Sequence, residues 1–420
     1  MGIRVSSLIE AEGYELIGGG VCASAGFMAN GLRCGLNDTP GKNDLGLIVC
    51  EKDCVTAGVY TSNKVKGAPI TVTKSHLEKT GGISRAIIMN SKNANTCNAD
   101  GIEKAEKMCE LVENATGIMP GKVLVASTGV IGQPLPIEPI EAKISELAAG
   151  LCREGHLEAE KAVMTTDTVP KEAAVEFRCG GKMCHLGGMA KGSGMIDPHM
   201  ATTLNFITSD VNIDEEMLQM ALSDVVKDTY NCLSVDGDMS TNDMVLLMSD
   251  GYAGNKKIEK DDNADYEVFR NALYNVMMNL TRMLAADGEG ASKLLECDVI
   301  GAPDHDEAVI AAKSVIGSNL FKCAVFGADA NWGRILCALG YADASYDISK
   351  VSVSISSPAG TIDVCKNGAG ISFSEEEAKK VLTEKEITVS VDLHQGDGKA
   401  SAWGCDLTYD YVKINGDYRS

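Results

Sequence analysis

A mixed α/β fold, either α+β or layered α/β, is predicted by three features of the sequence. Segments with helical spacing of apolar residues alternate with short apolar runs typical of strands along all 420 residues. Hydrophobic residues make up 45% and charged residues 23%, the proportions of a globular protein that can bury a sizeable core. No repeat of fixed period and no low-complexity linker divides the chain. Together these features disfavour a single doubly wound parallel sheet and a disordered chain.

Strands are expected where apolar and β-branched residues cluster between turn residues. The runs 174–179 and 182–186 flank Gly180 and Gly181, so they predict a β-hairpin. The other expected strands are, in chain order, 44–51, 85–90, 122–127, 204–208, 244–249, 350–356, 386–393 and 406–414.

Helices are expected where apolar residues recur every three to four positions. The segment that begins at Asp306 also has an acidic start, which favours a helix N-terminus. The expected helices are, in chain order, 103–113, 144–152, 215–233, 266–286, 306–321 and 375–382.

The charge and the cysteines limit the classes of function. The chain has 38 Lys and Arg against 59 Asp and Glu, a net charge of −21 that repels nucleic-acid phosphates. Fifteen cysteines in a chain without an apolar run at the N-terminus predict reduced thiols in the cytoplasm. No apolar stretch reaches the ~18 residues that a membrane span needs. We therefore expect a cytoplasmic protein that binds neither nucleic acid nor membranes.

A metal site or a cofactor is not expected. Cys179, Cys184 and His185 are close in sequence, but they flank the Gly180–Gly181 turn of the expected hairpin, and no CxxC pair occurs. Many of the cysteines lie in apolar runs, where cysteine acts as a small core residue.

The segment KGSGMIDPHMATTLNFITSD, residues 191–210, has features that a self-cleaving enzyme requires. A glycine-rich turn and the small residue Ala201 precede Thr202 at the opening of an apolar run. Cleavage before Thr202 would free an α-amine with a pKa of about 7.7–8.0, a suitable base for the neighbouring hydroxyl. From the pattern alone, a glycine-rich loop that leads into a core strand is the simpler interpretation.

The segment VLVASTGVIG, residues 123–132, ends an apolar strand with Thr128 and Gly129. A hydroxyl and a main-chain N–H at a strand end can donate together to an oxyanion. The alternative is an ordinary strand-to-loop turn. The segment lacks the GK[ST] ending of a phosphate-binding loop.

Three further polar segments are open to two interpretations. MTTDT contains Thr166 and is also typical of a helix cap or an Asx turn. AADGEGASK places Glu289 between two glycines, where it either approaches a ligand ammonium group or lies in a solvated loop. INGDYRS contains Asn415 and Ser420 at a terminus, and termini usually fray.

In their order along the chain, these blocks resemble the ornithine acetyltransferase family of arginine biosynthesis, also called glutamate N-acetyltransferase. The resemblance runs nearly end to end, and the motif around Thr202 together with DGEGASK is its most specific part. The matching blocks include GFMANGLRCGL, AGVYTSNKVKGAPI, NSKNANTCN, ASTGVIG, MTTDTVPK, MAKGSGMIDPHMATTL, SVDGDMSTNDMV, DGEGASK, FGADANWGRI and INGDYRS.

The resemblance implies an Ntn-like layered α/β sandwich and a precursor that cleaves itself between Ala201 and Thr202. The products would be an alpha chain, residues 1–201, and a beta chain, residues 202–420, which pair into a heterotetramer of two each. Thr202 would accept an acetyl group from N2-acetylornithine, release ornithine and pass the acetyl group to glutamate.

The resemblance also assigns roles to individual residues. Thr128 and Gly129 would form the oxyanion hole. The residues expected at the substrate are Thr166, Lys191, Thr202, Glu289, Asn415 and Ser420. This set suits amino-acid substrates, because Lys191, Asn415 and Ser420 can bind a shared α-carboxylate.

Four positions depart from the family pattern without removing a nucleophile or an oxyanion donor. Lys92 stands where Gly is more common, His199 where Asn is usual, Thr203 where Met is common, and Ala330 where Pro is common.

The acetyl donor is the main open choice. The charge of −21 and the lack of a GxGxxG or GxxxxGK[ST] motif favour acetyl transfer from acetylornithine as the single activity. The alternative is a bifunctional enzyme that also uses acetyl-CoA. A self-cleaving amidase or aminopeptidase of the related fold would instead let water reach acyl-Thr202, and a non-enzymatic binding protein would stay uncleaved.

Overall fold

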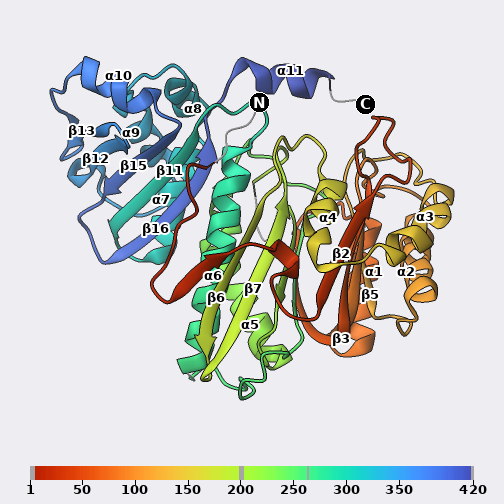
Figure 1. Ribbon diagram of the computed structural model, residues 1–420. Coiled ribbons are helices and arrows are strands. Elements are labelled where there is room, and N and C mark those ends of the chain that lie inside the picture. Colours follow the sequence, from red (N-terminus) through yellow and green to blue (C-terminus); the bar gives the residue numbers. More distant parts are fainter. Residues whose placement is uncertain (1–4, 198–202, 263, 418–420) are drawn as a thin grey trace.

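The computed structural model describes residues 5–197, 203–262 and 264–417, and contains two β-sheets with helices packed against them (Figure 1). The mixed α/β class predicted from the sequence is confirmed. The strands of the two sheets lie in separate lobes, and all strands of the second sheet except Leu233–Ser234 follow those of the first along the chain (Figure 1).

The first sheet has nine strands in the order β1-β6-β7-β8-β10-β3-β4-β5, with β2 paired to β3. Pairs β8–β10 and β4–β5 are parallel and the other pairs are antiparallel. The predicted hairpin is confirmed as β6 and β7. The bounds are β1 Tyr14–Ile17, β2 Phe27–Leu32, β3 Leu45–Tyr60, β4 Ile83–Asn90, β5 Val123–Ser127, β6 Glu172–Cys179, β7 Lys182–Lys191, β8 Leu204–Ser209 and β10 Met244–Ser249.

The register of this sheet brings distant segments to one edge. Lys191 at the end of β7 is paired with Leu204 at the start of β8, and Leu204 is paired with Met244 at the start of β10. β4 and β5 end side by side, with Asn90 opposite Ser127. The Asn242 amide, two residues before β10, donates to the Ser127 carbonyl at 2.9 Å, so the end of β5 lies close to the start of β10.

Six helices accompany the first sheet. α1 and α2 pack on β5, α5 packs on β3, and α6 packs on β6 and β7 while also touching β11 and β16 of the second sheet. Their bounds are α1 Ala68–Thr80, α2 Gly101–Thr116, α3 Glu138–Ala149, α4 His156–Val163, α5 Glu215–Asp228 and α6 Ala264–Ala286.

The second sheet has seven strands in the order β14-β13-β12-β15-β11-β16-β9, and α7 covers β11 and β16. Alternate residues of β15 are buried, the pattern of a strand with one face on the core. The bounds are β9 Leu233–Ser234, β11 Leu294–Ala302, β12 Ser352–Ser357, β13 Gly360–Lys366, β14 Ala369–Gly370, β15 Glu386–Asp392, β16 Gly398–Cys405, α7 His305–Ile316, α8 Asn319–Phe326, α9 Trp332–Tyr341 and α10 Glu375–Thr383.

The strand predicted at 406–414 is wrong, because most of this segment belongs to helix α11, Tyr409–Asp417. The Thr408 hydroxyl accepts from the Asp410 N–H at 3.2 Å and donates to the Gly290 carbonyl at 2.6 Å, so it starts the helix and fastens it to a loop. No residue of α11 is buried, and the helix extends from the second lobe toward the first (Figure 1). Its alternating apolar residues therefore do not face a core.

Two predicted helices are longer than the real ones. The helix predicted at 215–233 ends at Asp228, and the one predicted at 306–321 breaks at Gly317. Ser318 then accepts from the Phe321 N–H at 3.4 Å and begins α8. Within the ranges that the structure covers, no single helix is long and apolar enough to cross a membrane, although α7 and α8 together reach that length with a bend of 56° between them.

Candidate active site

Six of the predicted site residues line one cavity of about 420 Å³ at the strand ends of the first sheet. They are Thr128, Gly129, Thr166, Lys191, Glu289 and Asn415. Ala94, Thr165, Ser240, Thr241 and Asn242 also contribute to the wall. Three predicted residues, Ala201, Thr202 and Ser420, lie outside the described residues, as does His199.

The predicted oxyanion residues follow β5 directly. The Thr128 N–H donates to the Asn90 carbonyl at 3.0 Å, so the loop begins in register with β4. Gly129 has φ 131°, and a Cβ at this position would lie 2.2 Å from the carbonyl carbon of Lys92. Only glycine fits this close approach between two loops.

Lys92 has φ 72°, a left-handed conformation that favours glycine. A left-handed backbone at this position accounts for the glycine that is more common here in the predicted family, and Lys92 adopts that conformation in this chain. The Lys92 carbonyl accepts from the Val130 N–H at 3.0 Å, which holds the two loops together beside Gly129.

Asn242 is a buried connector in the cavity wall that the sequence interpretation missed. Its amide donates to the carbonyls of Ala94 at 2.6 Å and Ser127 at 2.9 Å. Its oxygen accepts from the hydroxyls of Thr96 at 2.6 Å and Thr241 at 2.7 Å. Asn242 lies in SVDGDMSTNDMV, a block that resembles the family. The sequence alone does not mark this side chain, because its main-chain partners lie far away along the chain.

Asp243 is a second missed residue and lies next to Asn242 in sequence. It is buried, and its Oδ2 atom has no hydrogen-bond partner among the residues that the structure covers. Burial raises the pKa of Asp243 well above its usual range, although Ser240, Lys191 and Thr61 oppose the shift. It is therefore a carboxyl group with a raised pKa close to the cavity lysine.

Lys191 and Thr166 approach the cavity from the end of β7 and from the loop before β6. The Lys191 ammonium lies 4.0 Å from Asp167 Oδ2, and its side chain is 11% exposed. Burial favours the neutral form of Asp167, but Lys171 and Lys191 outweigh burial and hold the pKa of Asp167 well below its usual range. The cavity thus has a fixed anion behind its lysine.

Glu289 and Asn415 contact each other at the cavity although they come from distant parts of the chain, the loop after α6 and helix α11. The Asn415 amide donates to Glu289 Oε2 at 2.7 Å. A Cβ on Gly194 would lie 2.3 Å from the Glu289 carboxyl carbon, so this carboxylate fills the space that a side chain would take. Helix α11 therefore contributes Asn415 to the cavity wall. The sequence predicts a strand or a chain terminus for the residues of this helix.

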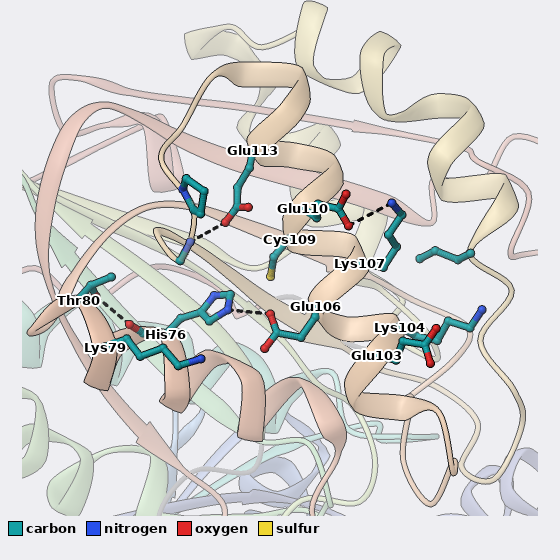
Figure 2. A pocket seen from close by; sticks show the side chains of 13 residues that line it. His76, Lys79, Thr80, Glu103, Lys104, Glu106, Lys107, Cys109, Glu110 and Glu113 are labelled. Atoms are coloured by element: carbon teal, nitrogen blue, oxygen red, sulfur yellow. Dashed lines mark hydrogen bonds and ion pairs between the residues drawn. The ribbon is translucent and has the colours of Figure 1, made fainter.

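A larger hollow of about 800 Å³ lies on the surface between α1 and α2 and contains none of the predicted site residues. Figure 2 shows its lining, in which His76 points toward Glu106 at 2.9 Å and the remaining charged side chains come from α1 and α2. His76 also bonds to the Val123 carbonyl at 2.7 Å, so it ties α1 to β5.

The fold and the first cavity define an enzyme class. A hydroxyl and a main-chain N–H at a strand end are suited to an oxyanion, while a lysine and a glutamate in the same cavity are suited to the charged ends of an amino acid. This combination is typical of acyl transfer between amino-acid substrates.

The comparisons with known proteins agree with that class. The model of the ArgJ family matches residues 28–420. The arginine biosynthesis bifunctional protein ArgJ 1 of Clostridium acetobutylicum is 50% identical over 395 residues, which cover 94% of this chain and 96% of that protein. The arginine biosynthesis bifunctional protein ArgJ of Symbiobacterium thermophilum is 47% identical over 408 residues, 97% of this chain and 100% of that protein.

Two solved structures are also similar. A crystal structure of arginine biosynthesis bifunctional protein ArgJ from Bacillus halodurans has 46% identity and a TM-score of 0.48, and covers 51% of this chain and 98% of that chain. Ornithine acetyltransferase complexed with ornithine from Mycobacterium tuberculosis has 37% identity and a TM-score of 0.41, and covers 45% of this chain and 100% of that chain.

The chain belongs to the ArgJ family. The family-model match and the relatives at 47–50% identity therefore confirm the predicted family and the predicted class, an acetyltransferase of arginine biosynthesis. The individual roles of the site residues, the cleavage and the assembly stay predictions.

Proposed function

We propose that this chain moves an acetyl group from N2-acetylornithine to glutamate through an acetyl-Thr202 intermediate. The observation that carries the proposal is the convergence of six predicted residues, from five separate segments of the chain, on one cavity. Residues predicted as separate motifs would have no reason to share a cavity if each were an ordinary turn.

The transfer has two balanced steps. The Thr202 hydroxyl oxygen attacks the acetyl carbonyl carbon, the carbon–nitrogen bond breaks, and the hydroxyl proton ends on the amine of released ornithine. The amine of glutamate then attacks the acetyl ester, the ester bond breaks, and Thr202 recovers its proton. In each step Thr128 and the Gly129 N–H would donate to the oxyanion.

Substrate charges match the cavity. Both amino acids carry an α-carboxylate, and Lys191 would bind it as a cation. Glu289 would accept from the side-chain ammonium of ornithine. Asn415, which the resemblance assigns to the α-carboxylate, donates to Glu289 in this structure, so its amide would instead donate to the side-chain carboxylate of glutamate. One polar pair could thus accommodate opposite charges.

Cleavage between Ala201 and Thr202 belongs to the same proposal. The Thr202 hydroxyl would attack the Ala201 carbonyl and leave an alpha chain of residues 1–201 and a beta chain of residues 202–420. β8 and β10 come from the second piece and lie between β7 and β3 from the first piece. Two cleaved chains would therefore remain joined in one sheet, as the proposed heterotetramer requires.

The names of the relatives favour a second activity. These proteins, 47–50% identical to this chain, are called bifunctional. We therefore propose that acetyl-CoA is a second acetyl donor. The sequence motifs alone favour acetylornithine as the single donor. A local cationic group supports the second donor: Lys42 donates to the carbonyl of the cavity residue Thr165 at 2.7 Å. Burial lowers the pKa of Lys42, Asp167 opposes this shift, and the charges of Lys191 and Lys92 lower the pKa further.

Mass spectrometry of the purified protein combined with an acetyl-transfer assay tests these proposals. We expect two pieces that meet at Ala201 and Thr202, one added acetyl group on the 202–420 piece with acetylornithine alone, and acetylglutamate when glutamate is added. Thr202→Ala should stay intact and inactive. Active protein that remains uncut would contradict the mechanism, acetylornithine hydrolysis that outpaces transfer would favour the amidase, and no product from acetyl-CoA would contradict the second activity alone.

A further inference from the structure

A buried lysine lies between two buried aspartates beneath the cavity. Lys171 Nζ donates to Asp167 Oδ1 at 2.8 Å and to Asp287 Oδ2 at 2.7 Å, and all three side chains are at most 1% exposed. Asp287 is 116 residues away from Lys171 in the sequence. Burying three charges is costly unless each is paired and hydrogen-bonded, so this cluster needs every one of its contacts.

Asp167 joins two of the loops that line the cavity. Its Oδ1 atom accepts from the Gly192 N–H at 2.8 Å, and its Oδ2 atom accepts from the Thr165 N–H at 3.1 Å. Thr166 lies between Thr165 and Asp167, and Lys191 directly precedes Gly192. The carboxylate therefore holds these two cavity residues at a constant separation.

Asp287 joins the third loop. Its Oδ2 atom accepts from the Thr168 N–H at 3.0 Å, and its main-chain carbonyl accepts from the Ser193 hydroxyl at 2.7 Å. The Ser193 carbonyl in turn accepts from the Glu289 N–H at 2.8 Å. Through Lys171, the loops that carry Thr166, Lys191 and Glu289 are connected by charged contacts.

The charges of the cluster balance only when Lys191 is included. Two carboxylates and Lys171 sum to −1, and Lys191 makes the total zero. Lys171 occupies Asp167 Oδ1, whereas the Lys191 ammonium stays 4.0 Å from Oδ2 and lines the cavity. Lys191 is thus the one member of this four-residue cluster whose charge faces the cavity.

We propose that Lys171, with Asp167 and Asp287, positions the substrate-binding loops and keeps the Lys191 ammonium beyond hydrogen-bond distance of Asp167, so that it can bind the α-carboxylate of both amino-acid substrates. The three are positioning residues and do not touch the substrate. The proposal rests on the function proposed above, because it assumes that Lys191 binds this carboxylate.

Lys171→Met tests the proposal, with Arg282→Met as the matched control. Arg282 is also buried, near the end of α6, and it holds Glu386 at 3.0 Å and Glu296 at 3.7 Å, but it does not line the cavity. Both variants remove one buried cation and leave two carboxylates. We expect Lys171→Met to raise KM for acetylornithine and for glutamate at least tenfold with kcat within threefold, and Arg282→Met to leave both KM values within twofold at a similar loss of Tm.

The double variant Lys171→Met with Asp287→Asn removes one positive and one negative charge, so the total charge of the cluster stays zero. It provides the test if the single variant folds poorly. It leaves Lys191 as the only ammonium of the four-residue cluster, so we again expect at least a tenfold rise in KM. KM values within twofold of wild type, a fall in kcat alone, an equal KM rise in Arg282→Met, or failure of both Lys171 variants to fold would each overturn the positioning role. A wild-type chain without acetyl transfer would instead overturn the proposed function.

Discussion

Two buried lysines, one in each lobe, differ in what surrounds them. Beside the cavity, Lys171 is held by two carboxylates, and although burial disfavours its charge, Asp167 and Asp287 raise the pKa of Lys171 above its usual range. In the second lobe, Lys293 is held by the main-chain carbonyls of Val325 at 2.5 Å and Leu382 at 2.6 Å. Burial lowers the pKa of Lys293, and Asp406 only partly opposes this.

The different partners of the two lysines indicate different roles, substrate binding near Lys171 and stabilisation of the fold near Lys293. Val325 and Leu382 lie in the last turns of α8 and α10, where carbonyls lack partners within the helix, so Lys293 completes the packing of two helices. Lys171 instead joins loops that carry cavity residues. Changes near Lys171 should therefore alter substrate binding, and changes near Lys293 should alter stability.

The largest expected contrast between the lobes is in turnover. Thr128→Ala removes a proposed oxyanion donor, so it should lower kcat by about 10²–10³-fold with little change in KM, as measured by steady-state kinetics. Thr383→Ala removes a hydroxyl that donates to the Lys379 carbonyl at 2.6 Å in the second lobe and should leave kcat unchanged. A rise in KM alone for Thr128→Ala would mean that this hydroxyl binds substrate and does not stabilise the oxyanion.

Lys293→Met should show the opposite behaviour. It leaves two carbonyls without their charged donor and should reduce the free energy of unfolding by about 1–3 kcal/mol. Urea denaturation measures this loss, and kcat should stay within about twofold of wild type. Loss of turnover without loss of stability would remove the distinction between the lobes.

The pH dependence of stability sharpens the comparison, because the two pKa values move in opposite directions. The pKa of Lys171 is raised in the folded state, so its stabilising contribution is present below the unfolded value of about 10.4 and is lost as pH rises through the folded pKa. The pKa of Lys293 is lowered, so its penalty is present below the folded pKa and is relieved as pH rises toward the unfolded value.

Denaturation from about pH 8 to pH 11 measures these opposite slopes. The stability advantage of wild type over Lys171→Met should shrink as pH rises, while its advantage over Lys293→Met should grow. Equal slopes for the two variants would show that the carboxylates do not control Lys171.

The smallest expected effects concern backbone strain. Lys92→Gly should raise the free energy of unfolding by about 0.5–1 kcal/mol, because a φ of 72° is costly for Lys. Asn367 in the second lobe has φ 50°, and Asn367→Gly should gain less because Asn tolerates this conformation better. A larger gain for Asn367→Gly in calorimetric Tm values would contradict this account of the Lys92 departure.

The candidate site was predictable wherever chemistry is local to a short motif. Thr128 and Gly129 follow an apolar strand, and Glu289 lies between two glycines, so adjacent residues alone mark these positions as candidates. Asn242 could not be found in this way, because its partners Ala94 and Ser127 are more than 100 residues away. Helix α11 was predicted as a strand, since the contact of Thr408 with Gly290 that starts it is also long-range.

The sequence by itself determined the mixed α/β class, the β6–β7 hairpin and the family, because alternation of apolar residues and ordered motif blocks are properties of the chain read in one direction. The tertiary structure alone decided that residues before and after Thr202 share one sheet, that α11 reaches the cavity, and that Lys171 joins Asp167 to Asp287. The physical reason is that burial makes charge pairing obligatory only after folding, and the identity of each partner depends on which distant segments the sheet register brings together.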